Sequence, residues 1–66
     1  MGKFQVKFYY ADDTYYSGTF ERYNLETLIK NFNGTRFILL PDKNTLINLD
    51  HITSIDIEEV INEKNR

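Results

Sequence analysis

His51 is the only histidine in this 66-residue chain, and the chain contains no cysteine. A catalytic or metal-binding histidine needs partners that converge on it, and no HxxxH or ExxH pattern is present. Asp50 and Asp56 flank His51 without forming a recognisable catalytic dyad. We therefore interpret His51 as a surface turn residue. We expect a protein that is not an enzyme and uses no cofactor or metal. A catalytic site that includes His51 and Asp50 would have to be shared between two subunits.

Three carboxylates near the end of the chain, Asp56, Glu58 and Glu59, raise the question of a calcium or magnesium site. Loops that bind these ions space their oxygen donors closely around a turn that contains glycine. Here the acids lie along an alternating strand pattern, which points them outward and apart. We favour a solvated strand whose charges discourage aggregation between sheets.

The outer face of the first predicted hairpin has a sharper functional interpretation. Alternation places two aromatic and two cationic side chains there, with smaller polar side chains and one carboxylate: Lys3, Lys7, Tyr9, Tyr15, Ser17, Thr19 and Glu21. Aromatic rings on a sheet beside cations can stack single-stranded bases. Tyrosine also suits the centre of a protein contact, and two facing tyrosines can simply stabilise the sheet. These three interpretations stay open, in the order stabilising pair, protein contact and nucleic acid.

The charge distribution argues against strong attraction to nucleic acid. The net charge is −2 and the isoelectric point is about 5.2. Residues 1–41 carry five cationic side chains against four carboxylates, and residues 42–66 carry three against six. An anionic partner would therefore have to meet the N-terminal part of the chain.

One short amphipathic helix is predicted over residues 24–33. Asn24 is a good N-cap, because its side-chain oxygen can accept a hydrogen bond from a free amide of the first turn. Gly34 can adopt the left-handed conformation that ends a helix. The apolar residues follow the i, i+3, i+4, i+7 rule along one face, namely Leu25, Leu28, Ile29 and Phe32.

The remaining pattern predicts strands over residues 3–10, 14–22, 35–40, 45–49 and 53–60. Pairing Tyr10 with Thr14 sets the register of the first hairpin and places Gly18 on its core side. We expect Leu28 or Phe32 to fill the gap above Gly18, with a bulge as the alternative. The apolar run of residues 37–40 predicts either a central strand or one near a subunit contact.

The predicted fold is a small single α+β domain, β-β-α-β-β-β, with a mostly antiparallel sheet curled around the helix and an open strand order. It spans residues 1–61, and residues 62–66 form a polar C-terminal tail. Asp50 is expected to cap a turn before the last strand. The predicted core consists of Phe4, Val6, Phe8, Phe20, Leu25, Leu28, Ile29, Phe32, Phe37, Leu39, Ile47, Ile52, Ile55 and Ile57.

The composition is similar to that of products of AT-rich bacterial or bacteriophage genomes. The run from Thr45 to Ile55 resembles the strand–turn–strand ending of many small bacterial and phage proteins, and this resemblance transfers no functional residue. From the alternation of the N-terminal residues we expect neither a signal peptide nor a membrane span there. We therefore predict a cytoplasmic protein-interaction module with a protein partner still to be identified. Weak binding of single-stranded nucleic acid is the alternative, and self-association would use an edge strand or the side of Ile38 and Leu40.

Overall fold

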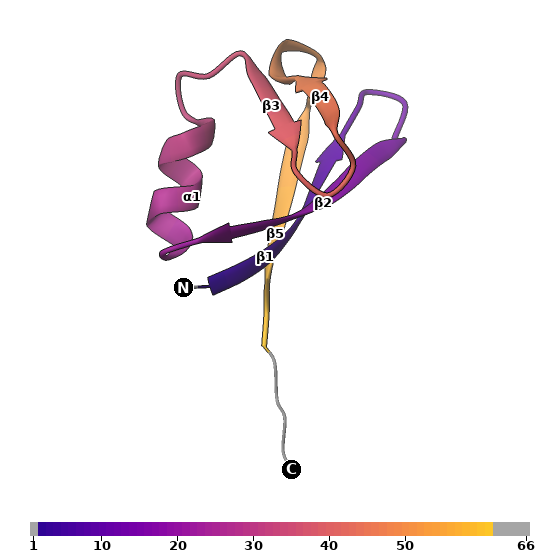
Figure 1. Cartoon of the computed structure of the whole chain (residues 1–66). Coiled ribbons are helices and arrows are strands. Elements are labelled where there is room, and N and C mark those ends of the chain that lie inside the picture. Colours follow the sequence, from indigo (N-terminus) through magenta and orange to yellow (C-terminus); the bar gives the residue numbers. More distant parts are fainter. Residues whose placement is uncertain (1, 62–66) are drawn as a thin grey trace.

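The computed structural model describes residues 2–61 of the chain, so the predicted tail lies outside the described residues. The element order confirms the predicted β-β-α-β-β-β arrangement (Figure 1). Its elements are β1 (Gly2–Tyr9), β2 (Tyr15–Arg22), α1 (Leu25–Phe32), β3 (Phe37–Leu40), β4 (Thr45–Asn48), the 3₁₀ turn η1 (Leu49–His51) and β5 (Ser54–Val60).

The strands form two antiparallel sheets. One contains three strands in the order β2-β1-β5, and the other is the β3–β4 hairpin. Figure 1 shows this hairpin in front of the three-stranded sheet, with α1 beside it. The strand order, which the sequence left open, brings the last strand back to pair with the first.

The first hairpin has the predicted register. Val6 lies opposite Gly18 and Tyr9 lies opposite Tyr15, and the Tyr10 amide donates to the Thr14 carbonyl at 2.8 Å. Asp13 takes the positive φ of the turn, at 72°, a conformation that Asp tolerates better than most residues. Alternation along β1 and the predicted Tyr10–Thr14 pairing were therefore sufficient to place both faces of this hairpin.

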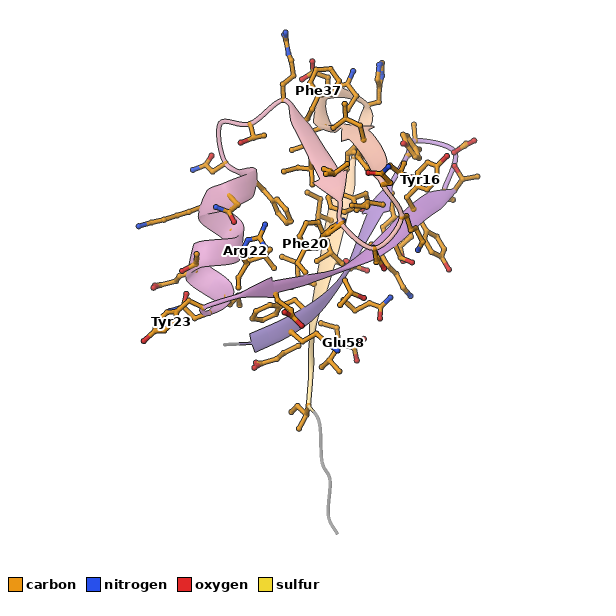
Figure 2. The ribbon with its side chains drawn as sticks, viewed as in Figure 1. Tyr16, Phe20, Arg22, Tyr23, Phe37 and Glu58 are labelled. Atoms are coloured by element: carbon orange, nitrogen blue, oxygen red, sulfur yellow. The ribbon has the colours of Figure 1, made fainter. Side chains whose placement is uncertain are left out.

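The core lies between the three-stranded sheet and the layer formed by α1 and the β3–β4 hairpin. Phe32 of α1 packs edge-on against Phe8 and Phe20, with ring centroids 5.6 Å away in both cases. Figure 2 shows Phe20 pointing into this space. The buried side chains are Phe4, Val6, Phe8, Phe20, Leu28, Ile38, Leu40 and Ile47. Partly buried around them are Phe32, Leu49, Ile52, Ile55 and Ile57.

Helix α1 has the predicted ends, but its apolar face is only partly covered. The Asn24 side chain accepts a hydrogen bond from the Thr27 amide at 2.9 Å, and Gly34 has a φ of +79°. The prediction that Leu25 and Ile29 belong to the core is wrong, because they are 46% and 48% exposed. The helix meets the sheet along the line of Leu28 and Phe32, so residues on either side of that line stay in solvent.

Strand β3 faces the opposite way from the prediction. Ile38 and Leu40 are buried, whereas Phe37 and Leu39 are 47% and 50% exposed. Within residues 2–61, β3 pairs with β4 alone, so it is not a central strand. Self-association through the side of Ile38 and Leu40 is also wrong, because those side chains already fill the core.

The gap above Gly18 is filled by the second hairpin rather than by the helix. A Cβ atom at Gly18 would lie 2.8 Å from Leu40 Cδ2, and the register of β2 runs through Gly18 without a bulge. The prediction that Leu28 or Phe32 occupies this position is therefore wrong. Leu40 reaches it because β3 passes close to β2.

Candidate functional site

The outer face of the three-stranded sheet carries the residues that the sequence singled out. Its three rows of side chains point away from the core, and neighbours across the strands follow from the register. On this face lie Tyr15, Ser17, Thr19 and Glu21 from β2, Lys3, Gln5, Lys7 and Tyr9 from β1, and Ser54, Asp56, Glu58 and Val60 from β5.

Three of the four predicted site residues come together at one end of this face. The rings of Tyr9 and Tyr15 have centroids 5.2 Å apart, and Lys7 Nζ lies 5.3 Å from the centroid of the Tyr15 ring. A cation at this distance is attracted by the quadrupole of the ring, with an energy of roughly 0.5–1 kcal/mol at an exposed site. We call Lys7, Tyr9 and Tyr15 the tyrosine face.

Lys3, the fourth predicted residue, does not join the tyrosine face. It lies four residues before Lys7 on β1, which corresponds to about 13 Å along a strand. Its cross-strand neighbours are Glu21 on β2 and Val60 on β5. Lys3 is therefore part of the same sheet surface but not of the same contact site.

The sequence did not reveal that β5 adds two carboxylates to this surface. Asp56 lies opposite Lys7, and Glu58 lies opposite Gln5. A shallow depression between β1 and β5 is lined by Gln5, Lys7, Asp56, Ile57 and Glu58. The alternation in β5 had predicted that Asp56 and Glu58 point outward, but only the strand order places them beside Lys7. The outer face thus carries Lys3 and Lys7 against Glu21, Asp56 and Glu58.

A second pair of tyrosines lies on the opposite side of the β1–β2 hairpin. The rings of Tyr10 and Tyr16 have centroids 6.1 Å apart in an edge-on arrangement, and Tyr16 is 47% exposed. Figure 2 shows Tyr16 near the turn end of this hairpin. The end of this hairpin therefore displays aromatic rings on both of its faces.

His51 and Asp50 lie in the exposed turn η1. The Asp50 carboxylate faces Arg36, with Oδ2 3.2 Å from Arg36 Nε. The prediction that Asp50 caps the turn is wrong, because the side chain of Asn48 accepts the Asp50 amide at 3.0 Å instead. Asn48 fits this position because Asn is a preferred N-cap residue.

No group of three or more His, Asp or Glu side chains within residues 2–61 could together hold a metal ion. Nor does this range contain a helix with the length and apolar character needed to cross a membrane.

Comparisons of the chain with protein-family models, with curated proteins and with solved structures gave no match.

Proposed function

We propose that this protein is a non-enzymatic protein-interaction module and that the tyrosine face is its contact site. The observation that supports this proposal is the packing of the half-buried Tyr9 against the exposed Tyr15, with Lys7 over the Tyr15 ring. Tyrosine contributes a large contact area and a hydroxyl group while losing little side-chain entropy. The paired strands hold both rings in place before a partner arrives, which lowers the entropic cost of binding.

The charges beside the tyrosine face favour a protein over a nucleic acid. Asp56 and Glu58 lie on the same surface as Lys7, and Glu21 lies at its other end. A phosphate backbone would meet these carboxylates along with the two lysines. A protein partner can present charges of both signs to such a mixed surface.

Weak binding of single-stranded nucleic acid is the second candidate. Lys7 above the ring of Tyr15, with Tyr9 beside it, resembles a small stacking platform with a phosphate-binding cation. This candidate predicts that Tyr9→Ala or Tyr15→Ala weakens binding by about 1–3 kcal/mol per stacked base and that salt also weakens it.

Site-specific photo-crosslinking in cells tests the first candidate. A benzophenone amino acid at position 15 is expected to trap a defined partner protein, whereas the same amino acid at Lys30 on α1 is not. Tyr9→Ala should then reduce binding of that partner to the purified protein. Equal capture from positions 15 and 30, or unchanged binding by Tyr9→Ala, would contradict the proposal.

Amide NMR spectra of the labelled protein separate the two candidates. Mixed-sequence single-stranded oligonucleotide is added at low salt. Shifts confined to Lys7, Tyr9 and Tyr15 would promote the nucleic-acid candidate above the protein candidate. We expect no such shifts.

We also propose that the module is a cytoplasmic accessory protein of a bacterium or phage, as its composition indicates.

A further inference from the structure

The two edges of the three-stranded sheet differ in how far they are closed. Along β2, the backbone groups of Ser17 and Glu21 point away from β1, as alternation along a paired strand requires. Both of these carbonyl groups already accept a cationic donor. Lys43 Nζ donates to the Ser17 carbonyl at 2.6 Å, and Arg22 Nη1 donates to the Glu21 carbonyl at 2.8 Å.

Along β5, alternate backbone groups are left open. The Tyr9 carbonyl accepts the Thr53 amide at 2.8 Å, which shows that the odd-numbered residues of β1 bond toward β5. With Asp56 opposite Lys7, the backbone groups of Asp56 and Glu58 bond to β1. Those of Ile55, Ile57 and Glu59 therefore point outward, and no hydrogen bond to them occurs within residues 2–61. We call these outward groups the β5 edge.

The side chains of β5 are arranged in two rows with different chemistry. Asp56 and Glu58 lie exposed on the outer face, and Ile55 and Ile57 lie partly buried at the rim of the core. A strand added along the β5 edge would face the carboxylates with one set of alternate residues and the isoleucines with the other. If the added strand runs antiparallel to β5, its residues opposite Asp56 and Glu58 form non-hydrogen-bonded pairs with them. In such pairs the cross-strand side chains approach most closely.

We propose that the β5 edge binds an extended, basic segment of a partner protein by strand addition. The segment alternates Lys or Arg, opposite Asp56 and Glu58, with apolar residues opposite Ile55 and Ile57. Backbone hydrogen bonds hold the segment, and the two carboxylates select its charge. This inference does not rest on the proposed function, because the β5 edge consists of backbone groups of β5, whereas the tyrosine face consists of side chains of β1 and β2.

A second copy of β5 is excluded as the occupant by the same charges. Antiparallel pairing of two β5 strands would bring their Asp56 and Glu58 carboxylates together on one face. Like charges directly opposite each other destabilise a sheet, which is how natural edge strands avoid self-pairing. The acidic row therefore rejects its own copy and favours a basic strand.

Amide hydrogen exchange with synthetic peptides tests the proposal. The probe is a capped heptapeptide of alternating Lys and Val, and its controls are the same residues in two blocks and an alternating Glu–Val peptide. The Lys–Val probe is expected to slow exchange at Ile55, Ile57 and Glu59 by about tenfold near saturation. The two control peptides are expected to leave these amides unchanged.

A matched pair of variants at Glu59 isolates the backbone contribution. Glu59→Pro removes an outward N–H group without removing a bond to β1, and Glu59→Ala removes the same side chain but keeps that group. We expect Glu59→Pro to weaken binding of the Lys–Val probe by about tenfold or more and Glu59→Ala to weaken it by less than about threefold.

Glu58→Lys keeps the proposal testable if Glu59→Pro does not fold. This substitution reverses the charge at position 58. It should weaken binding of the Lys–Val probe by between about twofold and tenfold and should improve binding of the Glu–Val peptide. Equal protection by the blocked peptide, unchanged binding by Glu59→Pro, or protection that rises with protein concentration without peptide would each overturn the proposal. Slower amide exchange confined to Tyr9 and Tyr15 on addition of the Lys–Val probe would also overturn the proposal.

Discussion

The two hairpins of this protein show how much a polar–apolar pattern can and cannot determine. In the β1–β2 hairpin, polar and apolar residues alternate along β1, the predicted turn sets the pairing with β2, and the buried face is the predicted one. In the β3–β4 hairpin, the four residues of β3 are all apolar, and β3 buries the face opposite to the predicted one, whereas Ile47 of β4 is buried as predicted. Alternation assigns a face, whereas a continuous apolar run does not.

The contact between the hairpins decides which residues of β3 are buried. Leu40 fits above Gly18, where β2 has no side chain, and this places Ile38 on the same side. Phe37 and Leu39 then point into solvent, and Figure 2 shows Phe37 at the start of β3. A glycine in one hairpin therefore sets the orientation of the other.

The largest expected effect is that of Leu40→Ala. Leu40 is fully buried, and its loss should lower the free energy of unfolding by about 2–5 kcal/mol, through lost burial and the cavity that remains. Urea unfolding followed by circular dichroism measures this loss. A domain of this size could be largely unfolded by it.

Leu39→Ala is the matched control for that prediction, because Leu39 is the neighbouring residue in β3 and is half exposed. We expect it to change the free energy of unfolding by less than about 1 kcal/mol. A Leu39→Ala loss as large as that of Leu40→Ala would mean that both faces of β3 are covered, and the contrast between the hairpins would fail.

A smaller effect is expected for Gly18→Ala. The added Cβ would lie 2.8 Å from Leu40 Cδ2 in the fully buried contact between the hairpins, and the resulting overpacking should cost about 1–3 kcal/mol of unfolding free energy. Chemical denaturation of the single and double variants with Leu40→Ala measures the coupling. Because Leu40→Ala makes room, Gly18→Ala should cost much less in that background. Additive losses would show that the two residues do not meet.

The smallest expected effect is on the pKa of Asp12, in the turn that closes the β1–β2 hairpin. Hydrogen bonds from the Thr14 hydroxyl, at 2.7 Å, and from the Thr14 amide lower the pKa of Asp12 from its usual 3.8. Because the pKa of Asp12 is lower in the folded state, its ionised carboxylate stabilises the fold at pH values above the unfolded-state pKa. This stabilisation is lost as pH falls through the folded-state pKa. Thr14→Val should raise the pKa of Asp12, as measured by carboxyl NMR titration.

Thr45→Val is the control for the turn prediction. Thr45 follows the second turn and donates its hydroxyl to the Lys43 carbonyl rather than to a carboxylate. The pKa of Asp12 should therefore not change in this variant. An equal rise in both variants would show that Thr14 does not hold the Asp12 carboxylate.

The sequence by itself determined the features that depend on neighbouring residues. Asn24 and Gly34 fixed the ends of α1, because caps act within one turn of the backbone. Alternation along β1, together with the turn that pairs Tyr10 with Thr14, fixed the register and faces of β1 and β2, because slipping by one residue would move the apolar side chains of β1 to the outer face. The same alternation grouped Lys7, Tyr9 and Tyr15 on the outer face.

Only the tertiary structure decided the features that depend on which distant segments meet. Pairing of β5 with β1 placed Asp56 beside Lys7 and left one sheet edge open. Packing of β3 onto Gly18 buried Leu40 and exposed Leu39, although both residues are leucine. The narrow contact of α1 with the sheet exposed Ile29. In each case the local pattern allowed more than one arrangement, and packing between segments far apart in the sequence selected one.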